Sequence, residues 1–304
     1  TYPVRIEQSL KGSWLPAYIA LGFVWGCSFL FIEQGLTFLT PFGVAFGRCA
    51  LGALTLVIYL KVRKLELPKD PTVWLKLWIV SLLLNSVPGV LFAQAQTQVT
   101  SILAGIINAT TPLMTLLVML IVFRDEKVSR NQIFGLMVGA AGIATVFGIW
   151  NGVGENPWWA IAALLLAVLC YGTSFPYSRK YVIPLQLKSE VLAATQLIMG
   201  TATLLPFYLY DGIADDQYRI IPILSMLALG VFGSGFAYIW NFKLIKEAGS
   251  TIASTVTYIT PLVAVIMGLI FLNEPLTWNE PVGGLVVLLG AAISQNRLVL
   301  FRRA

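Results

Sequence analysis

Polar and aromatic side chains recur at helical spacing inside the long apolar segments of this chain. Trp25 and Ser28 are three residues apart, and Tyr171 and Ser174 repeat this spacing in a later segment. Residues three or four positions apart share one face of a helix. Each pair therefore predicts a stripe that faces a cavity, where aromatic contact and a few hydrogen bonds are typical of small-molecule recognition.

Arg48 is the only charged residue well inside an apolar segment. An ionisable residue at that depth is a functional candidate. Two roles stay open for it: contact with the carboxylate of a ligand, and a structural tie to backbone carbonyls. Because Arg48 follows Pro41 by only seven residues, about 10 Å of helix, its long side chain is also able to reach the outer surface.

Two prolines lie in the middle of apolar segments. Proline lacks an amide hydrogen and displaces the carbonyl four residues earlier, which is that of Asn108 for Pro112 and that of Thr257 for Pro261. Freed backbone groups inside a membrane need a partner from the protein or a water-lined cavity. A static kink satisfied by nearby hydroxyls and a substrate-lining site are equally compatible with this pattern.

Helix-breaking residues interrupt two further apolar runs, at 85–89 and at 230–235. Paired interruptions in corresponding membrane helices are typical of a ligand site. With the polar residues downstream of them, they complete the candidate set. The candidate substrate-binding residues are Trp25, Ser28, Arg48, Asn85, Gln94, Asn108, Tyr171, Ser174, Gln196, Tyr238 and Tyr258, and the candidate hinges or kinks are Pro88, Pro112, Gly233 and Pro261.

The elements that must position these residues are membrane helices. Apolar residues make up 58% of the chain and charged residues 11%, against roughly 45–50% and about 25% in soluble proteins. Apolar runs of about 20 residues match the thickness of a bilayer. We therefore predict an all-α integral membrane protein with ten transmembrane helices, at 14–32, 41–60, 74–96, 101–123, 131–149, 157–178, 189–210, 220–242, 250–272 and 279–299.

The distribution of positive charge predicts the orientation of these helices. All of the 20 Lys and Arg residues except Arg48 and Arg219 lie in alternate loops, in the terminal segments or at the span ends beside them. Lys and Arg are enriched in cytoplasmic loops, so both termini are predicted to be cytoplasmic. The net charge of +6 follows from this asymmetry and does not indicate nucleic-acid binding.

The two halves of the chain resemble one another. Segment 25–29 (WGCSF) matches 171–175 (YGTSF), and Arg48 falls opposite Gln196. Because each repeat would hold five spans, an odd number, the second copy must be inverted in the membrane. We therefore predict two five-helix repeats, 1–150 and 151–304, an architecture that recurs in secondary transporters.

Several other motifs are interpreted as structural. Thr277-x-x-Glu280 and Ser129-x-x-Gln132 fit capping boxes at helix starts, and Glu126 and Glu274 lie in loops. Spaced glycines in the fifth and tenth spans predict close helix packing, either as a scaffold or as a dimer contact. These glycines are Gly135, Gly139, Gly142, Gly283, Gly284 and Gly290.

The residue types that are missing also limit the function. The chain has no histidine and three scattered cysteines, so we expect no metal site, no disulfide framework, no cofactor and no enzymatic activity. The 14 carboxylates lie in loops or at span ends, which predicts transport without an intramembrane proton relay. Glu33 and Glu190 are the carboxylates nearest to the membrane interior.

Together these features resemble the EamA-type drug/metabolite transporter family, over nearly the whole chain. Within that family the sequence looks most like bacterial inner-membrane exporters of aromatic and other neutral amino acids. The resemblance implies a central cavity that opens alternately to each side, export as the direction, and a monomer or homodimer. The alternatives are an organic-phosphate or nucleotide-sugar exchanger, which would need more cations in the cavity, and a passive channel.

Overall fold

The computed structural model describes residues 14–123, 130–148, 157–214 and 219–294, and it is helical throughout these ranges apart from turns and a single isolated β-bridge. Eight continuous helical segments are long and apolar enough to cross a membrane. They match the first four predicted spans and the sixth to ninth, and are Leu15–Gly35, Pro41–Val62, Pro71–Gln96, Ser101–Val122, Trp158–Leu185, Ser189–Asp211, Ile220–Glu247 and Ser250–Leu272.

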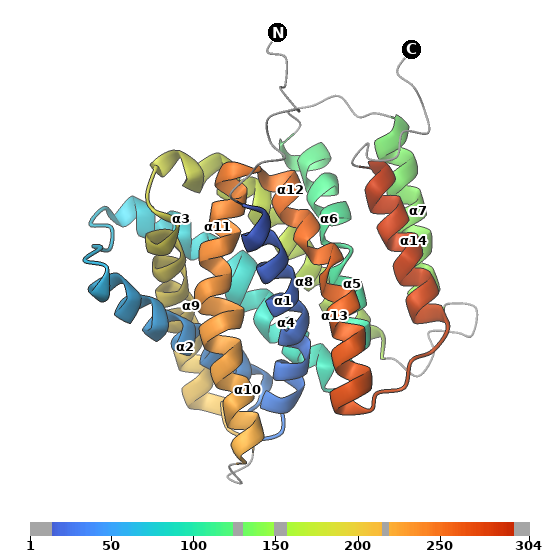
Figure 1. The fold of residues 1–304 in the computed structure, drawn as a ribbon, viewed down its shortest axis with the longest axis horizontal. Coiled ribbons are helices and arrows are strands. Elements are labelled where there is room, and N and C mark those ends of the chain that lie inside the picture. Colours follow the sequence, from blue (N-terminus) through green and yellow to red (C-terminus); the bar gives the residue numbers. More distant parts are fainter. Residues whose placement is uncertain (1–13, 124–129, 149–156, 215–218, 295–304) are drawn as a thin grey trace.

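The fifth and tenth predicted spans correspond to shorter helices. They are α7 (Arg130–Val146) and α14 (Asn279–Ser294), with 17 and 16 residues in the described part of the chain. In Figure 1 the helix α1 begins, and α14 ends, on the same side of the bundle. This placement agrees with an even number of crossings.

Several of the long segments are subdivided by local changes in helix geometry. The first half of the chain consists of α1 (Leu15–Gly35), α2 (Pro41–Val62), α3 (Pro71–Ser81), η2 (Leu82–Ser86), α4 (Val87–Gln96), α5 (Ser101–Asn108), α6 (Thr111–Val118), η3 (Met119–Phe123) and α7. The second half consists of α8 (Trp158–Tyr177), η4 (Ser178–Val182), η5 (Ile183–Leu185), α9 (Ser189–Asp211), α10 (Ile220–Gly230), η6 (Val231–Phe236), α11 (Ala237–Glu247), α12 (Ser250–Ser254), η7 (Thr255–Tyr258), α13 (Thr260–Met267), η8 (Gly268–Leu272) and α14.

The interruptions predicted in the third and eighth spans are wide π-helical turns. They are η2, which is followed by Pro88, and the glycine-rich η6. Pro88 has no amide hydrogen for a regular helical bond, and π-turns in α-helices are frequent at functional sites. The helical rod is therefore widened at these two places.

Side-chain caps mark the start of some of the helices. Thr40 accepts a hydrogen bond from the Gly43 amide (3.2 Å), and Asp70 accepts one from the Thr72 amide (2.8 Å). The Glu280 carboxylate accepts bonds from the amide (2.8 Å) and the hydroxyl (3.0 Å) of Thr277. The reciprocal half of the predicted capping box is not formed as predicted, because the Glu280 amide donates to the Thr277 carbonyl (3.2 Å) and not to the Thr277 hydroxyl. Ser129 and Glu126 lie outside the described residues.

Glycine allows α7 and α14 to pack closely along their length, as the glycine spacing predicts. A Cβ atom at Gly142 would lie 3.0 Å from the Gly283 carbonyl oxygen, and one at Gly283 would lie 2.8 Å from that of Gly142. In Figure 1 this pair stands at one edge of the bundle, and it packs there against α6 through the apolar cluster that contains Leu113 and Val287.

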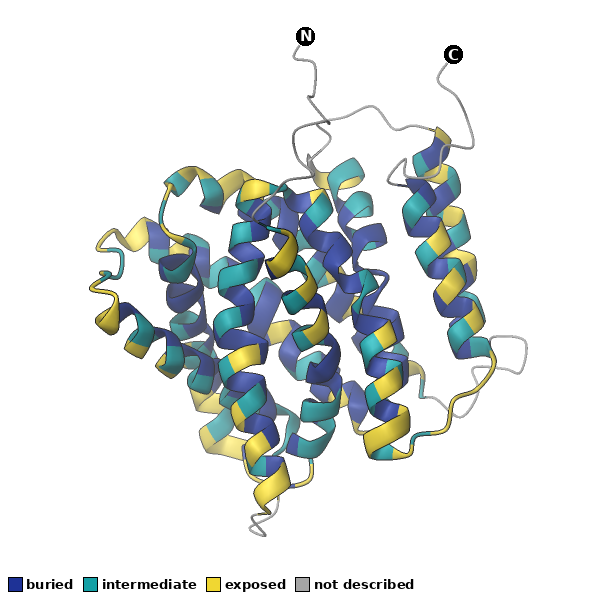
Figure 2. Cartoon of the chain, in the orientation of Figure 1, coloured by how far each residue is buried: buried dark blue, intermediate teal, exposed yellow. Residues whose placement is uncertain are grey.

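The burial pattern leaves many large apolar side chains on the exterior and places several polar residues within the largely apolar interior. Large apolar side chains such as Leu54, Leu209 and Phe271 are exposed on the outer faces, while Arg48, Asn108 and other polar residues are buried. Figure 2 shows the exposed positions in yellow, mainly on outward faces and at helix ends. This arrangement is expected where lipid is the surrounding solvent, and it assigns the polar residues to the interior.

Candidate functional site

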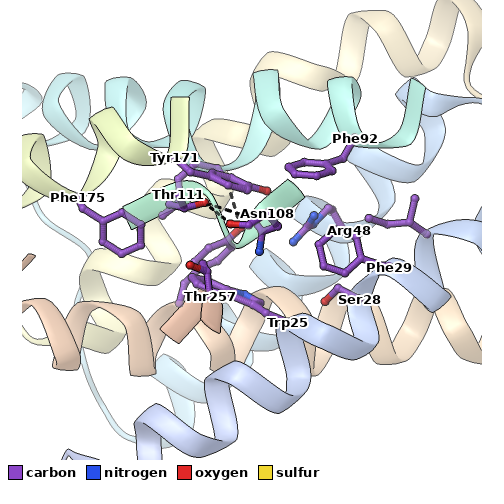
Figure 3. A pocket seen from close by; sticks show the side chains of 13 residues that line it. Trp25, Ser28, Phe29, Arg48, Phe92, Asn108, Thr111, Tyr171, Phe175 and Thr257 are labelled. Atoms are coloured by element: carbon purple, nitrogen blue, oxygen red, sulfur yellow. Dashed lines mark hydrogen bonds between the residues drawn. The ribbon is translucent and has the colours of Figure 1, made fainter. Parts of the chain in front are cut away.

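A cavity lies in the middle of the bundle and is lined from both halves of the chain. Its walls come from α1, α2, η2, α4, α5, α6, α8, α11 and η7, whereas α7, α9 and α14 contribute nothing. Figure 3 shows the lining side chains around the central space and labels ten of them. The lining residues are Trp25, Ser28, Phe29, Ile32, Arg48, Leu84, Phe92, Asn108, Thr111, Tyr171, Phe175, Tyr238 and Thr257.

Aromatic rings make up much of the wall. Phe92 stacks on Tyr171 with ring centroids 5.6 Å apart, and Phe29 meets Phe92 edge-on at 5.6 Å. Across the cavity Trp25 meets Tyr238 edge-on at 6.1 Å. Such pairs hold their rings in fixed orientations, so the cavity has stable apolar faces.

Arg48 supplies the positive charge of the cavity. Only 5% of its surface is exposed, and its Nε donates to the Ser234 hydroxyl at 3.2 Å. The phenol groups of Tyr171 and Tyr238 also interact with the guanidinium. Among the described residues no carboxylate pairs with it. Burial therefore excludes the expectation that Arg48 reaches the outer surface, and its tie is to a hydroxyl instead of backbone carbonyls.

At both mid-span prolines, a threonine hydroxyl donates to the carbonyl that the proline leaves free, as expected for a static kink. The Thr111 hydroxyl donates to the Asn108 carbonyl (2.7 Å), and the Thr260 hydroxyl donates to the Thr257 carbonyl (2.8 Å). The Asn108 amide in turn donates to the Thr260 hydroxyl (3.2 Å), which joins α5 to α13. Asn108, Thr111 and Thr257 also line the cavity.

The free space inside the cavity is small. Its volume is about 40 Å³, counted over the centres of water-sized spheres, and roughly 10–15 Å³ of such volume holds one water. A metabolite needs several times this space. A ligand of that size therefore requires the lining side chains or the helices to move, and we call this arrangement, whose cavity is too small for a metabolite, the occluded conformation.

The structure brings together six of the eleven predicted substrate-binding residues, namely Trp25, Ser28, Arg48, Asn108, Tyr171 and Tyr238. Asn85 is buried beside the cavity residue Leu84, and its amide donates to Ser81 at 3.5 Å. Ser174 is buried and donates to the Tyr171 carbonyl at 2.8 Å. These two residues lie behind the lining.

The remaining three predicted residues do not line the cavity. Phe92 and Gln96 are four residues apart and share the buried face of α4. Gln94 lies between them on the opposite face, and it is exposed. Tyr258 packs against the apolar cluster between α6, α7 and α14. Gln196 is buried in α9, away from the cavity. We do not keep Gln94 and Tyr258 as site residues.

Comparison with known proteins assigns the bundle to a family. The sequence model of the EamA-like transporter family matches residues 12–148 and again 158–295. The chain belongs to the EamA-like transporter family. The two matches are separated by the segment between α7 and α8, so each half of the chain is one copy of the family's repeat unit.

Relatives and a solved structure agree with this assignment. An uncharacterized Archaeoglobus fulgidus transporter is 24% identical over 92% of this chain and 97% of its own. The Escherichia coli inner membrane transporter YedA is 28% identical over 83% of this chain and 80% of its own. A crystal structure with 16% identity aligns with a TM-score of 0.67 over 94% of this chain and 99% of the other, which supports the fold. This chain is therefore a multi-pass membrane protein of a transporter family.

Seven lining residues of this EamA-like protein are absent from the predicted substrate-binding set, namely Phe29, Ile32, Leu84, Phe92, Thr111, Phe175 and Thr257. Some of them continue the predicted stripes. Phe29 and Ile32 share the helix face of Trp25 and Ser28, and Phe175 lies one turn after Tyr171. Leu84 and Phe92 carry no such signal, because an apolar side chain in a membrane helix has the same composition whether it faces lipid or a cavity.

Proposed function

We propose that this protein is an alternating-access transporter that exports small metabolites, and that its preferred substrates are aromatic or other neutral amino acids. The observation that carries the proposal is the buried Arg48 guanidinium, which has no carboxylate partner among the described residues and lies in a cavity walled by aromatic rings. A buried charge without a counter-charge is costly. A substrate carboxylate would supply that counter-charge.

The rest of the cavity fits the other parts of such a substrate. The faces of Trp25, Phe92 and Tyr171 suit an aromatic or apolar side chain. The Asn108 side chain and the hydroxyls of Ser28 and Thr111 offer acceptors to an ammonium group. An organic phosphate or nucleotide-sugar would be expected to require further cations, and Arg48 is the only Lys or Arg that lines the described cavity.

We further propose that the chain crosses the membrane ten times as two inverted repeats, 1–150 and 151–304, with both termini in the cytoplasm of a bacterial cell. Equivalent elements support this. The turns η2 and η6 lie at matching places in the two halves, and η3 (Met119–Phe123) and η8 (Gly268–Leu272) are both five-residue turns 149 positions apart. Inverted repeats support alternating access because the halves are able to exchange conformations.

The test is counterflow in proteoliposomes loaded with unlabelled phenylalanine. We expect saturable uptake of labelled phenylalanine and other neutral amino acids, with little uptake of phenethylamine or phenylalanine methyl ester, which lack the carboxylate. We also expect Arg48→Gln to abolish this preference. Uptake of sugar phosphates in place of amino acids would contradict the substrate assignment, and flux that does not saturate would indicate a channel.

Two further measurements test the site and the coupling. Tyr171→Ala and Asn108→Ala should each reduce flux while the protein remains folded, because both side chains line the cavity. Unchanged flux in both variants would mean that the cavity is not the transport site. No carboxylate lines the described cavity, so transport should persist when the pH gradient is collapsed. Strict dependence on that gradient would overturn transport without a proton relay.

A further inference from the structure

Gln196 and Ser86 are buried polar residues that lack hydrogen-bond partners. Both polar atoms of the Gln196 side chain and the Ser86 hydroxyl are without a partner among the described residues. Gln196 is fully buried and Ser86 is 3% exposed. An unsatisfied polar group is unfavourable in a membrane interior, and buried polar groups in proteins are nearly always paired. The occluded conformation therefore leaves these two groups poorly satisfied.

These two residues hold the positions equivalent to Arg48 and Ser234. Gln196 follows Arg48, and Ser234 follows Ser86, by 148 residues in each case. Arg48 lies on α2 and Ser234 on the π-turn η6, while Gln196 lies on α9 and Ser86 on the π-turn η2. The Arg48–Ser234 hydrogen bond is formed at 3.2 Å. The equivalent bond between Gln196 and Ser86 is absent.

The surroundings of the two pairs are alike. One turn after Arg48, a Cβ atom at Gly52 would lie 3.1 Å from the Ser234 Cβ and 3.1 Å from Leu197. One turn after Gln196, a Cβ atom at Gly200 would lie 3.6 Å from the Ser86 hydroxyl and 3.3 Å from the Cys49 sulfur. Cys49 and Leu197 are themselves 148 residues apart. The α2–η6 and α9–η2 contacts therefore use equivalent residues, and only one of them closes its hydrogen bond.

We propose that Gln196 and Ser86 form a hydrogen bond in the opposite conformation of the transport cycle, when the bond between Arg48 and Ser234 opens. This inference rests on the proposed alternating access of two inverted repeats, in which each half takes up the arrangement that the other half leaves. A bond that exists in one conformation only shifts the equilibrium toward that conformation. Gln196 and Ser86 are thus positioning residues and do not contact substrate in the occluded state.

The two pairs differ in charge, and of their four residues only Arg48 lines the cavity. Arg48 is a cation, so its release from Ser234 changes the donors that it offers to a bound carboxylate. Gln196 is neutral and sits outside the cavity, so its bond with Ser86 stabilises a conformation without competing for an anionic substrate. The two bonds together link the conformation of the bundle to the state of the substrate site.

The proposal is tested by measuring conformational populations directly. Spin labels at Lys69→Cys and Lys188→Cys, which are exposed on different halves at the positively charged side, report the distance between the halves in a cysteine-free background. We expect two distance populations in the wild-type protein. Gln196→Leu and Ser86→Ala should each shift the ratio by about five- to tenfold toward the occluded structure, since a buried hydrogen bond has about that effect.

The double variant distinguishes a shared bond from two independent effects. Because either substitution removes the same bond, Gln196→Leu with Ser86→Ala should shift the ratio no further than one of them alone. Asn241→Leu is the matched control. Asn241 is also fully buried and unpartnered, but its equivalent position is occupied by Ala93. Its effect should therefore add to that of Ser86→Ala.

The outcomes separate this proposal from the proposed function. Additive shifts in the Gln196–Ser86 double variant, or no shift in either single variant, would overturn the switch and leave the proposed function standing, whereas a single distance population in the wild-type protein would overturn the switch and alternating access together. These readouts do not need a transported substrate, whereas counterflow of amino acids tests the proposed function alone. Gln196→Leu replaces an unpartnered amide by an apolar group, so it should retain or raise thermal stability, which serves as the folding control.

Discussion

The Tyr238 hydroxyl donates a hydrogen bond to the Leu84 carbonyl at 3.2 Å. Leu84 lies four residues before Pro88, which has no amide hydrogen to give to that carbonyl. Tyr238 of α11, in the second half of the chain, thus donates to the carbonyl that Pro88 in the first half leaves without its helical partner. Since Tyr238 also contacts the Arg48 guanidinium, the kink at η2 and the charged site share one side chain.

This relationship predicts the effect of Tyr238→Phe. Loss of the hydroxyl removes the donor to Leu84 and one of the groups that hold Arg48, so we expect a stability loss of about 0.5–1.5 kcal/mol and weaker transport of carboxylate substrates. Thermal unfolding and counterflow measure the two effects. Tyr210→Phe is the control, because Tyr210 is 92% exposed. Equal behaviour of the two variants would contradict the prediction.

The threonines at the proline kinks should be more sensitive than threonines on the surface. Thr111→Val leaves the Asn108 carbonyl without its donor, and Thr260→Val does the same for Thr257. A buried unsatisfied carbonyl costs about 1–3 kcal/mol, so both variants should unfold at lower temperature. Thr145→Val, which removes a similar bond at an exposed position, should change little. Rescue by Thr111→Ser would confirm that the hydroxyl carries the effect.

Glu274 is predicted to stabilise the fold without affecting substrate affinity. Its carboxylate accepts bonds from the Ser101 amide (2.8 Å), the Ser101 hydroxyl (2.9 Å) and the Ile102 amide (3.0 Å). It therefore caps the positive end of α5 with a negative charge. Glu274→Gln should lower stability by about 1 kcal/mol and leave KM unchanged, whereas Glu66→Gln on the surface should change neither stability nor KM. A raised KM in Glu274→Gln would show that the residue acts on the site.

Close packing of α7 on α14 should make Gly283→Val strongly destabilising. The added methyl groups would meet the backbone of α7 near Gly142 and Val146, and overpacking costs about 1–3 kcal/mol or more. We expect an unfolding temperature several degrees lower in detergent. Ala140→Val, at an exposed position of α7, is the control for added volume. Normal stability of Gly283→Val would mean that the two helices separate freely.

The sequence by itself determined that the chain is a helical membrane protein, and it predicted six of the residues that line the cavity. Apolar runs of membrane length have few alternatives to a helix, because backbone groups in lipid must bond internally. Because these segments had to be helical, local patterns predicted further features. Pro112 and Pro261 located the freed carbonyls, and the spacing of Trp25 and Ser28 predicted the face of α1 that lines the cavity.

Only the tertiary structure decided which polar residues meet. Local spacing cannot tell whether Gln94 or Tyr258 faces the cavity, because that depends on the neighbours of each helix. The lining residues Phe92 and Leu84 are indistinguishable from lipid-facing ones by type. The bond from Arg48 to Ser234 spans 186 positions. It forms because α2 packs against η6, a contact between distant segments that no local pattern encodes.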